Sequence, residues 1–194
     1  MTQGAVATRA CAPMWAGRPT PRRAPVAPGL GLIELLIGLA IVAILSGLAH
    51  AAYSHARARV ALADTRALVY FAAETASRHA VLHRQRVVWC PQAGGALCAD
   101  TADWSKGWLV YADRNRNGEL DAGEPLLLSQ VLSPDVSVTT TAGRQRLIFA
   151  SNGTAPGSNV TFSLCHRSQR SRPLTVVLAG SGRIRRGDAP ASCP

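Results

Sequence analysis

The feature that most constrains the fold of this chain is one long apolar run near the N-terminus. Between Leu30 and Ala52, the only formally charged residue is Glu34. About twenty consecutive apolar residues are enough to cross a bilayer as an α-helix, and this run is too long and too apolar for the buried helix of a soluble domain. The sequence therefore predicts one membrane-spanning helix over residues 30–52.

The segment before this run, residues 1–29, contains no apolar stretch of its own. It is rich in proline and carries four arginines and no acidic residue. A secretory signal has the opposite order, with its apolar stretch before the cleavage point. Here the candidate cleavage point, Gly29, precedes the apolar run, so cleavage would leave the helix on the mature chain. The arginines predict a cytoplasmic N-terminus and a periplasmic or extracellular remainder.

Glu34 is unusual within a membrane-spanning helix, because a carboxylate in hydrocarbon costs a few kcal/mol. A free α-amino group at Leu30 of a neighbouring subunit would be a suitable partner. In a low dielectric, the attraction between these two charges could set the register of packed helices.

Gly29 and the residues LGLIELL that follow it resemble the class III signal of type IV pilins and type II secretion pseudopilins. The resemblance implies that residues 1–29 are a leader that a prepilin peptidase removes by cutting between Gly29 and Leu30. It also implies N-methylation of Leu30 and a role for Glu34 in subunit docking. Leu30, Gly31 and Pro28 depart from the residues that are usual in the family at these positions.

One long helix followed by short strands is the predicted architecture. No proline occurs between Pro28 and Pro91, so one helix is expected from residue 30 to about residue 83, with residues 53–86 as an amphipathic continuation. The apolar stripe expected on it comprises Leu68, Phe71, Ala72, Thr75, His79 and Leu82. Strands are expected at 87–90, 108–111, 126–131, 136–140, 147–150, 160–165, 174–178 and 182–185. The fold class is therefore α+β, a pilin-like long helix packed on a mainly antiparallel head domain over residues 87–194.

Four of the five cysteines lie in the predicted head domain: Cys90, Cys98, Cys165 and Cys193. An even number of cysteines outside the cytoplasm indicates disulfides, and three pairings exist. Proximity in the sequence favours Cys90–Cys98 and Cys165–Cys193. No spacing typical of a zinc site is present.

Residues 113–124, DRNRNGELDAGE, match the calcium-loop pattern D-x-[DN]-x-[DN]-G-x5-E. The calcium ligands would be Asp113, Asn115, Asn117, Asp121 and Glu124, with Gly118 at the turn. The flanking segments predict strands, however, and two arginines lower the negative charge, so a polar hairpin without metal is favoured. The stretch GWLVYADRNRNGELDAGEPLLL, with FASNGT and FSLC, resembles the head domain of FimT/GspH-type minor pilins.

The C-terminal region from Cys165 onward holds six arginines against one acidic residue, Asp188. The arginines form two groups in the sequence: Arg167, Arg170 and Arg172, and Arg183, Arg185 and Arg186. If Cys165 pairs with Cys193, the two groups are expected to lie close together. Guanidinium groups bind phosphates through two parallel hydrogen bonds. Because no aromatic residue in this region could stack on a base, a bound nucleic acid would be contacted at its phosphates, with little preference for its base sequence.

Gly182-Arg183-Ile184-Arg185 resembles the GRxR motif near the C-terminus of FimT proteins. The resemblance implies DNA binding during natural transformation. The alternative interpretation is a basic edge strand whose charges prevent pairing with another sheet.

Two functions follow from these observations. The first is a FimT-like minor pilin of a type IV pilus, located in the inner membrane and the pilus, which binds extracellular DNA. The second is a GspH-like pseudopilin of a type II secretion system, or a minor pilin with a role in assembly alone. The expected partners are other pilins, the prepilin peptidase, the inner membrane and DNA. No catalytic motif or cofactor-binding motif indicates an enzyme.

Overall fold

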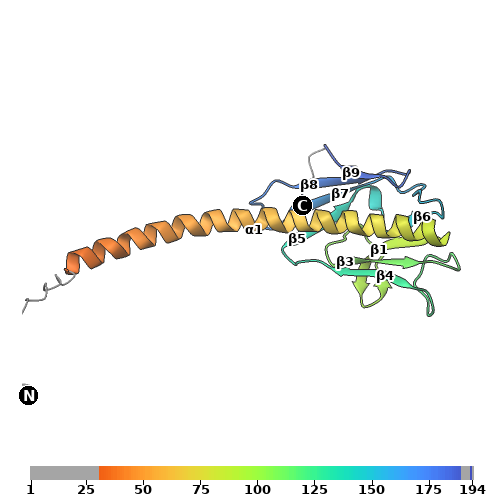
Figure 1. Ribbon diagram of the computed structural model, residues 1–194, viewed down its shortest axis with the longest axis horizontal. Coiled ribbons are helices and arrows are strands. Elements are labelled where there is room, and N and C mark those ends of the chain that lie inside the picture. The colour runs from red at the N-terminus through yellow and green to blue at the C-terminus, as the bar shows by residue number, and fades with distance from the viewer. Residues whose placement is uncertain (1–30, 189–192, 194) are drawn as a thin grey trace, which may run out of the picture. The chain divides into compact units, whose positions relative to one another are not determined.

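The structure, a computed structural model, describes residues 31–188 and Cys193 (Figure 1). Gly29 and Leu30, the expected cleavage and methylation positions, lie outside the described residues. In chain order, the elements are α1 (Leu32–His83), β1 (Val87–Gly94), β2 (Leu97–Cys98), β3 (Gly107–Ala112), β4 (Leu126–Val131), β5 (Val136–Thr140), the short 3-10 helix η1 (Thr141–Gly143), β6 (Leu147–Phe149), β7 (Val160–His166), β8 (Leu174–Leu178) and β9 (Ile184–Arg186). The described residues from Ala43 onward form one compact unit.

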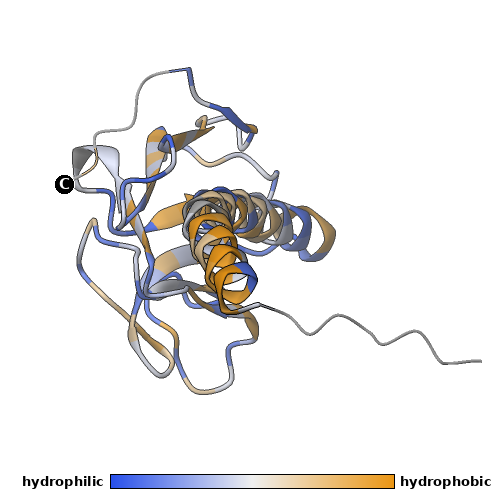
Figure 2. Ribbon diagram, turned by 90° about the vertical axis from the view of Figure 1, so that its left-hand side faces the viewer, coloured by the Kyte–Doolittle hydropathy of each residue, from blue (hydrophilic) through white to orange (hydrophobic). Residues whose placement is uncertain are grey.

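Helix α1 is long and apolar enough to cross a membrane by length and composition. Its first part is coloured as hydrophobic in Figure 2. The helix ends at His83 because Arg84 adopts a left-handed conformation with a φ of 52°. The N–H of Gln85 then donates to the carbonyl oxygen of Ala80 at 3.2 Å, which is the longer hydrogen bond of a Schellman cap.

The second part of α1 packs on the sheets through a stripe of small residues. The buried positions of the helix are Ala58, Leu62, Thr65, Val69, Ala72, Ala73, Ala76 and Ala80. The predicted stripe was therefore wrong in part, because Phe71 is 56% exposed and Leu82 is 71% exposed. Alanines allow the helix backbone to approach the sheets closely, and this packing turns the larger side chains outward.

The strands form two antiparallel sheets, as the sequence predicts. The first has the order β2-β1-β3-β4, with β6 also paired to β1, and the second has the order β5-β7-β8-β9. The eight predicted strands are present with small differences at their ends, whereas the two-residue strand β2 was not expected. Strand β9 lies at the edge of the second sheet, where it is paired with β8 alone.

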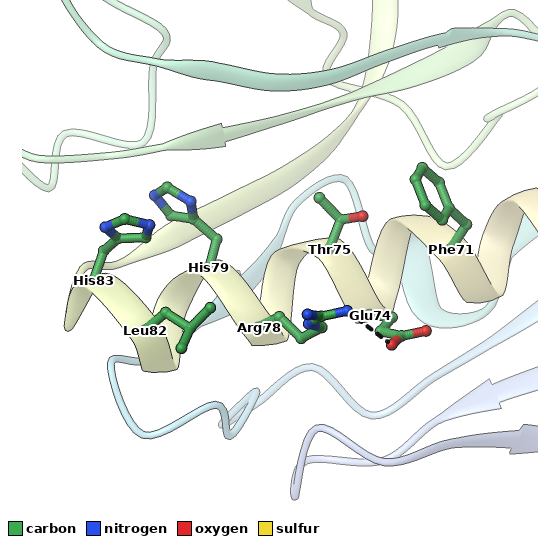
Figure 3. Close-up of a pocket in the computed structure, with 7 residues that line it drawn as sticks. All are labelled: Phe71, Glu74, Thr75, Arg78, His79, Leu82 and His83. Atoms are coloured by element: carbon green, nitrogen blue, oxygen red, sulfur yellow. Dashed lines mark ion pairs between the residues drawn. The ribbon is translucent and has the colours of Figure 1, made fainter.

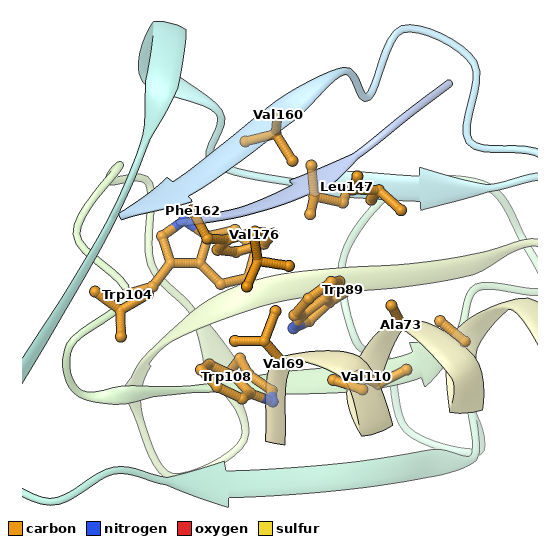
Figure 4. Close-up of a cluster of buried hydrophobic side chains, with 14 of the residues drawn as sticks. Val69, Ala73, Trp89, Trp104, Trp108, Val110, Leu147, Val160, Phe162 and Val176 are labelled. Atoms are coloured by element: carbon orange, nitrogen blue, oxygen red, sulfur yellow. The ribbon is translucent and has the colours of Figure 1, made fainter. Parts of the chain in front are cut away.

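An aromatic cluster joins the two sheets and α1 in one core (Figure 4). Trp89 of β1 stacks on Phe162 of β7, with 5.1 Å between the ring centroids. Trp104 and Trp108 meet the Trp89 ring edge-on at 5.4 and 5.9 Å. All four side chains are fully buried, and Val69 of α1 belongs to the same cluster. The head domain and the second part of α1 therefore share one hydrophobic core.

Both disulfides favoured by proximity are present in the structure. Cys90 and Cys98 have Cα atoms 5.7 Å apart, and Cys165 and Cys193 have Cα atoms 5.8 Å apart. The first bond closes the turn between β1 and β2. The second attaches the C-terminal end of the chain to β7.

Candidate functional site

The C-terminal arginines lie on or beside the edge strand β9. Antiparallel pairing with β8 places Ile184 opposite Leu178, Arg185 opposite Val177 and Arg186 opposite Val176. Leu178 and Val176 are fully buried, whereas Val177 is half-buried. Side chains alternate between the two faces of a strand. Arg185 therefore points away from the hydrophobic core, on the outer face of the second sheet.

The four residues of the GRxR-like motif have distinct structural roles. Ile184 packs against the main hydrophobic core and anchors the strand. Arg183, whose carbonyl oxygen accepts a hydrogen bond from the N–H of Ala179, directly precedes the strand. Both arginines are exposed. The motif thus presents two arginines at the start of an anchored strand.

Gly182 forms the turn that leads into β9. Its φ is +82°, and a Cβ atom at this position would collide with the carbonyl oxygen of Gly153. Its N–H donates to the carbonyl oxygen of Ala179. Gly182, which the sequence suggested as part of a DNA-binding motif, is therefore required by the backbone here.

Arg167, Arg170 and Arg172 lie in the loop between β7 and β8, and this loop contacts α1. The Nδ1–H of His55 donates to the carbonyl oxygen of Arg170 at 2.7 Å. The Arg167 guanidinium donates to the carbonyl oxygen of Pro134 at 2.6 Å. A hollow between the loop and the helix is lined by His55, Arg59, Leu62, Arg170, Ser171, Arg172 and Leu174.

The two arginine groups do not form one cluster. The β7–β8 loop precedes the start of β8, whereas Arg183 is hydrogen-bonded to Ala179, just beyond the end of that strand. At about 3.3 Å per residue, roughly 20 Å of strand separates Arg183 from the loop. The expectation that the Cys165–Cys193 disulfide brings both groups together was therefore wrong, although Arg186, opposite Val176, lies nearer the loop.

None of the six C-terminal arginines forms an ion pair with the described residues, although the guanidinium groups of Arg167 and Arg185 donate to backbone carbonyl oxygens. Within residues 31–188 and Cys193, the ion pairs of the structure involve Arg78, Arg86 and Arg146 only. The six C-terminal arginines are exposed. The helix residues Arg57 and Arg59, which the sequence analysis did not select, add positive charge beside the β7–β8 loop. Their position just after the apolar run was the signal that could have identified them.

The acidic loop, residues 113–124, connects the antiparallel strands β3 and β4. The Oδ2 atom of Asp113 accepts from the N–H of Gly118, and Glu124 accepts from the N–H groups of Arg114 and Asn115. The buried Oδ1 atom of Asp113 has no hydrogen-bond partner among the described residues. Asp121 accepts hydrogen bonds from the side-chain amides of Asn115 and Asn117 at 2.7 and 2.6 Å. In the described part of the chain, no group of three or more His, Cys, Asp or Glu residues is arranged to hold a metal ion.

Contacts of the buried Asp113 and Tyr111 side chains hold the acidic loop against the first sheet. Asp113 is 1% exposed and lies 3.2 Å from the guanidinium of Arg86. The hydroxyl of Tyr111 donates to the carbonyl oxygen of Gly118 at 2.7 Å. Burial of the Tyr111 side chain raises its pKa to about 12. These contacts fix the position of the loop on the first sheet.

A shallow groove runs along the exposed side of α1 near its C-terminal end (Figure 3). All residues that line it come from the helix: Phe71, Glu74, Thr75, Arg78, His79, Leu82 and His83. Arg78 and Glu74 form an ion pair at 3.6 Å, and the rings of His79 and His83 stack with centroids 4.2 Å apart. Burial lowers the pKa of His79, and the neighbouring charge of His83 lowers it further.

Comparison with known proteins gives one family match. Residues 69–182, more than half of the chain, match the family described as Type II transport protein GspH. No curated protein matches the sequence.

The structure is also similar to solved structures of two proteins. One is the type IV minor pilin FimU of Pseudomonas aeruginosa, strain PAO1. Its crystal structure in space group P21 is 17% identical over 69% of this chain and 90% of that chain, with a TM-score of 0.49. Its structure in space group P65 is 20% identical over 66% and 91%, with a TM-score of 0.47. The other is the minor pseudopilin EpsH from the type 2 secretion system of Vibrio cholerae, which is 14% identical over 65% and 95%, with a TM-score of 0.48.

Proposed function

Because the chain belongs to the GspH family of type II transport proteins, we propose that it is a minor pilin anchored in the inner membrane by the first part of α1. In this proposal the prepilin peptidase cuts between Gly29 and Leu30, and the new N-terminus is methylated. Glu34 then pairs with the α-amino group of a neighbouring pilin. The head domain lies outside the cytoplasm, where disulfides such as Cys165–Cys193 persist.

The proposed ligand of the head domain is DNA, bound through its phosphate backbone. The observation that carries this proposal is the register of β9, which places Arg185 on the outer face while Ile184 anchors the strand in the core. Arg183 directly precedes the strand and is held there by the hydrogen bond from Ala179. Two guanidinium groups on a fixed strand lose little conformational freedom when they bind phosphate oxygens. Arg186, on the other face of β9, extends the positive charge around the edge of the sheet.

The chemistry of this surface predicts salt-sensitive binding with little preference for sequence. Within the described residues, no tryptophan, tyrosine or phenylalanine lies on β9 or in the turn before it that could stack on a base. Contacts are therefore with phosphates, and each one releases counterions, so the affinity falls as salt rises.

The test compares duplex DNA binding by the full chain in detergent with binding by two charge-matched variants. Arg183→Gln/Arg185→Gln should lose most of the affinity, and the slope of log K against log salt should become smaller by about 2. Arg170→Gln/Arg172→Gln removes the same charge from the other arginine group and should bind nearly as tightly as the original chain. Equal affinity of the Arg183/Arg185 variant and the original chain would exclude this site.

A second candidate is a pseudopilin of a type II secretion system with a role in assembly alone. The description of the family favours it, and so does the groove of α1, in which Phe71 and Leu82 are exposed. Exposed apolar groups on a helix are typical of a surface that another subunit covers. If this candidate is right, Phe71→Ser should reduce incorporation of the subunit into the filament, and the Arg183/Arg185 variant should have no effect on DNA binding or uptake.

A further inference from the structure

The contact between α1 and the β7–β8 loop brings together basic residues that are far apart in the sequence. Residues 55–59 of α1 contribute His55, Arg57 and Arg59, and the loop contributes Arg170 and Arg172. We refer to these five residues as the basic collar. The hydrogen bond from His55 to the carbonyl oxygen of Arg170 fixes the loop at this level of the helix.

The basic collar carries a strong excess of positive charge. Arg170 lines two hollows: the first is also lined by Arg59 and Arg172, and the second by Arg57. The residues that line the first hollow include no carboxylate, and those that line the second include one, Asp135. Four arginines and one acidic side chain therefore face this part of the surface.

The distance of the basic collar from the predicted membrane span, measured along the axis of α1, indicates its binding partner. The predicted membrane span ends at Ala52, and at about 1.5 Å per residue His55 and Arg59 follow it by roughly 5 and 10 Å along the helix axis. The headgroup layer occupies roughly 5–8 Å on each side of the hydrocarbon core. The collar is thus at the depth of lipid phosphate groups, if the helix spans the membrane as proposed above.

We propose that the basic collar binds the phosphate groups of anionic phospholipids in the membrane leaflet next to the head domain. This inference rests on the proposed membrane anchor but not on the proposed DNA binding. Arginine forks match phosphate oxygens, and a surface arginine near an anionic membrane favours binding by about fivefold. Arginines beside a membrane span often serve to keep that end of the span in the cytoplasm. This does not explain the basic collar, because in the proposed orientation the collar lies on the non-cytoplasmic side of the membrane.

The consequence is a fixed position of the head domain at the membrane surface before the subunit enters a filament. The loop that contacts the lipid also contacts α1, so lipid binding would hold residues 167–173 and the helix together. Extraction of the subunit from the membrane would then require release of these phosphate contacts.

The test uses the full chain reconstituted in vesicles of phosphatidylcholine that contain spin-labelled phosphatidylglycerol or spin-labelled phosphatidylcholine. The immobilised fraction of each labelled lipid measures its association with the protein. We expect a several-fold preference for phosphatidylglycerol, which Arg170→Gln/Arg172→Gln reduces to near equality. Arg183→Gln/Arg185→Gln, with the same loss of charge far from the collar, should keep the preference.

Each other result has a distinct meaning. If the original chain immobilises equal fractions of the two lipids, the proposal that the basic collar binds anionic lipid is overturned, whereas the proposed membrane anchor is not. An equal reduction by both double variants would show that net charge, and not the collar, causes the preference, and would also overturn the proposal. No immobilised fraction of either lipid would overturn the membrane anchor itself, and the collar with it.

Discussion

Gly182 lies against the carbonyl oxygen of Gly153, with no room between them for a Cβ atom on Gly182. Gly153 in turn approaches α1, where the Ser77 hydroxyl donates to its carbonyl oxygen at 3.3 Å. The loop that contains Gly153 therefore contacts both the turn before β9 and helix α1. The position of Arg183 depends on this connection, because Arg183 follows the turn directly.

Gly182→Ala should destabilise the head domain by about 1–3 kcal/mol, because alanine is strained at a φ of +82° and its Cβ collides with backbone. Urea unfolding of the full chain in detergent, followed by tryptophan fluorescence, measures the loss. Gly157→Ala is the control, since Gly157 has a φ of +71° and open space around it. A loss as large at Gly157 would contradict the importance of the close approach.

Arg86→Gln should destabilise the head domain by about 3 kcal/mol, because it leaves the fully buried carboxylate of Asp113 without its cation. The same urea experiment measures the change. Arg146→Gln removes an arginine at the same 3.2 Å distance from Asp100, whose side chain is 70% exposed, and should cost about 1 kcal/mol or less. Similar losses in the two variants would argue against a special role for the buried pair.

Tyr111 should make stability sensitive to alkaline pH. Its pKa in the folded chain is raised to about 12 from the usual 10.0, so the unfolded chain loses this proton first as pH rises. The contribution is complete below pH 10 and is lost as pH rises towards 12. In Tyr111→Phe, this part of the pH dependence should disappear, and the ultraviolet titration should lose its latest tyrosinate step. An unchanged titration would refute the assignment.

Removal of the Cys165–Cys193 disulfide should destabilise the head domain more than removal of Cys90–Cys98. The sequence separations are 28 and 8 residues, and loop-closure entropy assigns about 3.5 and about 2.5 kcal/mol to such loops. Paired cysteine-to-alanine variants, compared by urea unfolding, measure the difference. The opposite order would indicate that the burial of Cys90, and not chain entropy, controls the outcome.

The elements of this fold could be predicted from local patterns in the sequence. Strand 126–131 is an example, because its apolar residues are bounded by turn residues on both sides. The exposed face of α1 could not be predicted in this way. Both Phe71 and Ala72 fit an apolar stripe, and the choice of Ala72 as the buried residue depends on how closely the sheets approach the helix.

In the candidate sites, too, some features could be predicted from local sequence patterns and others depend on the tertiary structure. The arginines of the C-terminal region and the alternation of Arg183, Ile184 and Arg185 are visible in the sequence. The separation of Arg183 from Arg170 is not, because it depends on the antiparallel pairing of β8 with β9 and on the contact of Arg170 with His55. In the acidic loop, the polar side chains are visible in the sequence, whereas the buried ion pair of Asp113 with Arg86 depends on the fold.

The sequence by itself determined the apolar run, the helix that continues from it and the positions of the strands along the chain, and it favoured the observed pairs of cysteines. Each of these depends on the spacing of residue types along one segment or on short separations in the chain. Tertiary structure alone decided which side of α1 is buried, which arginines share a surface and which stand apart. Those outcomes depend on close packing between segments that are distant in the sequence, because each side chain must fit the space that all its neighbours leave.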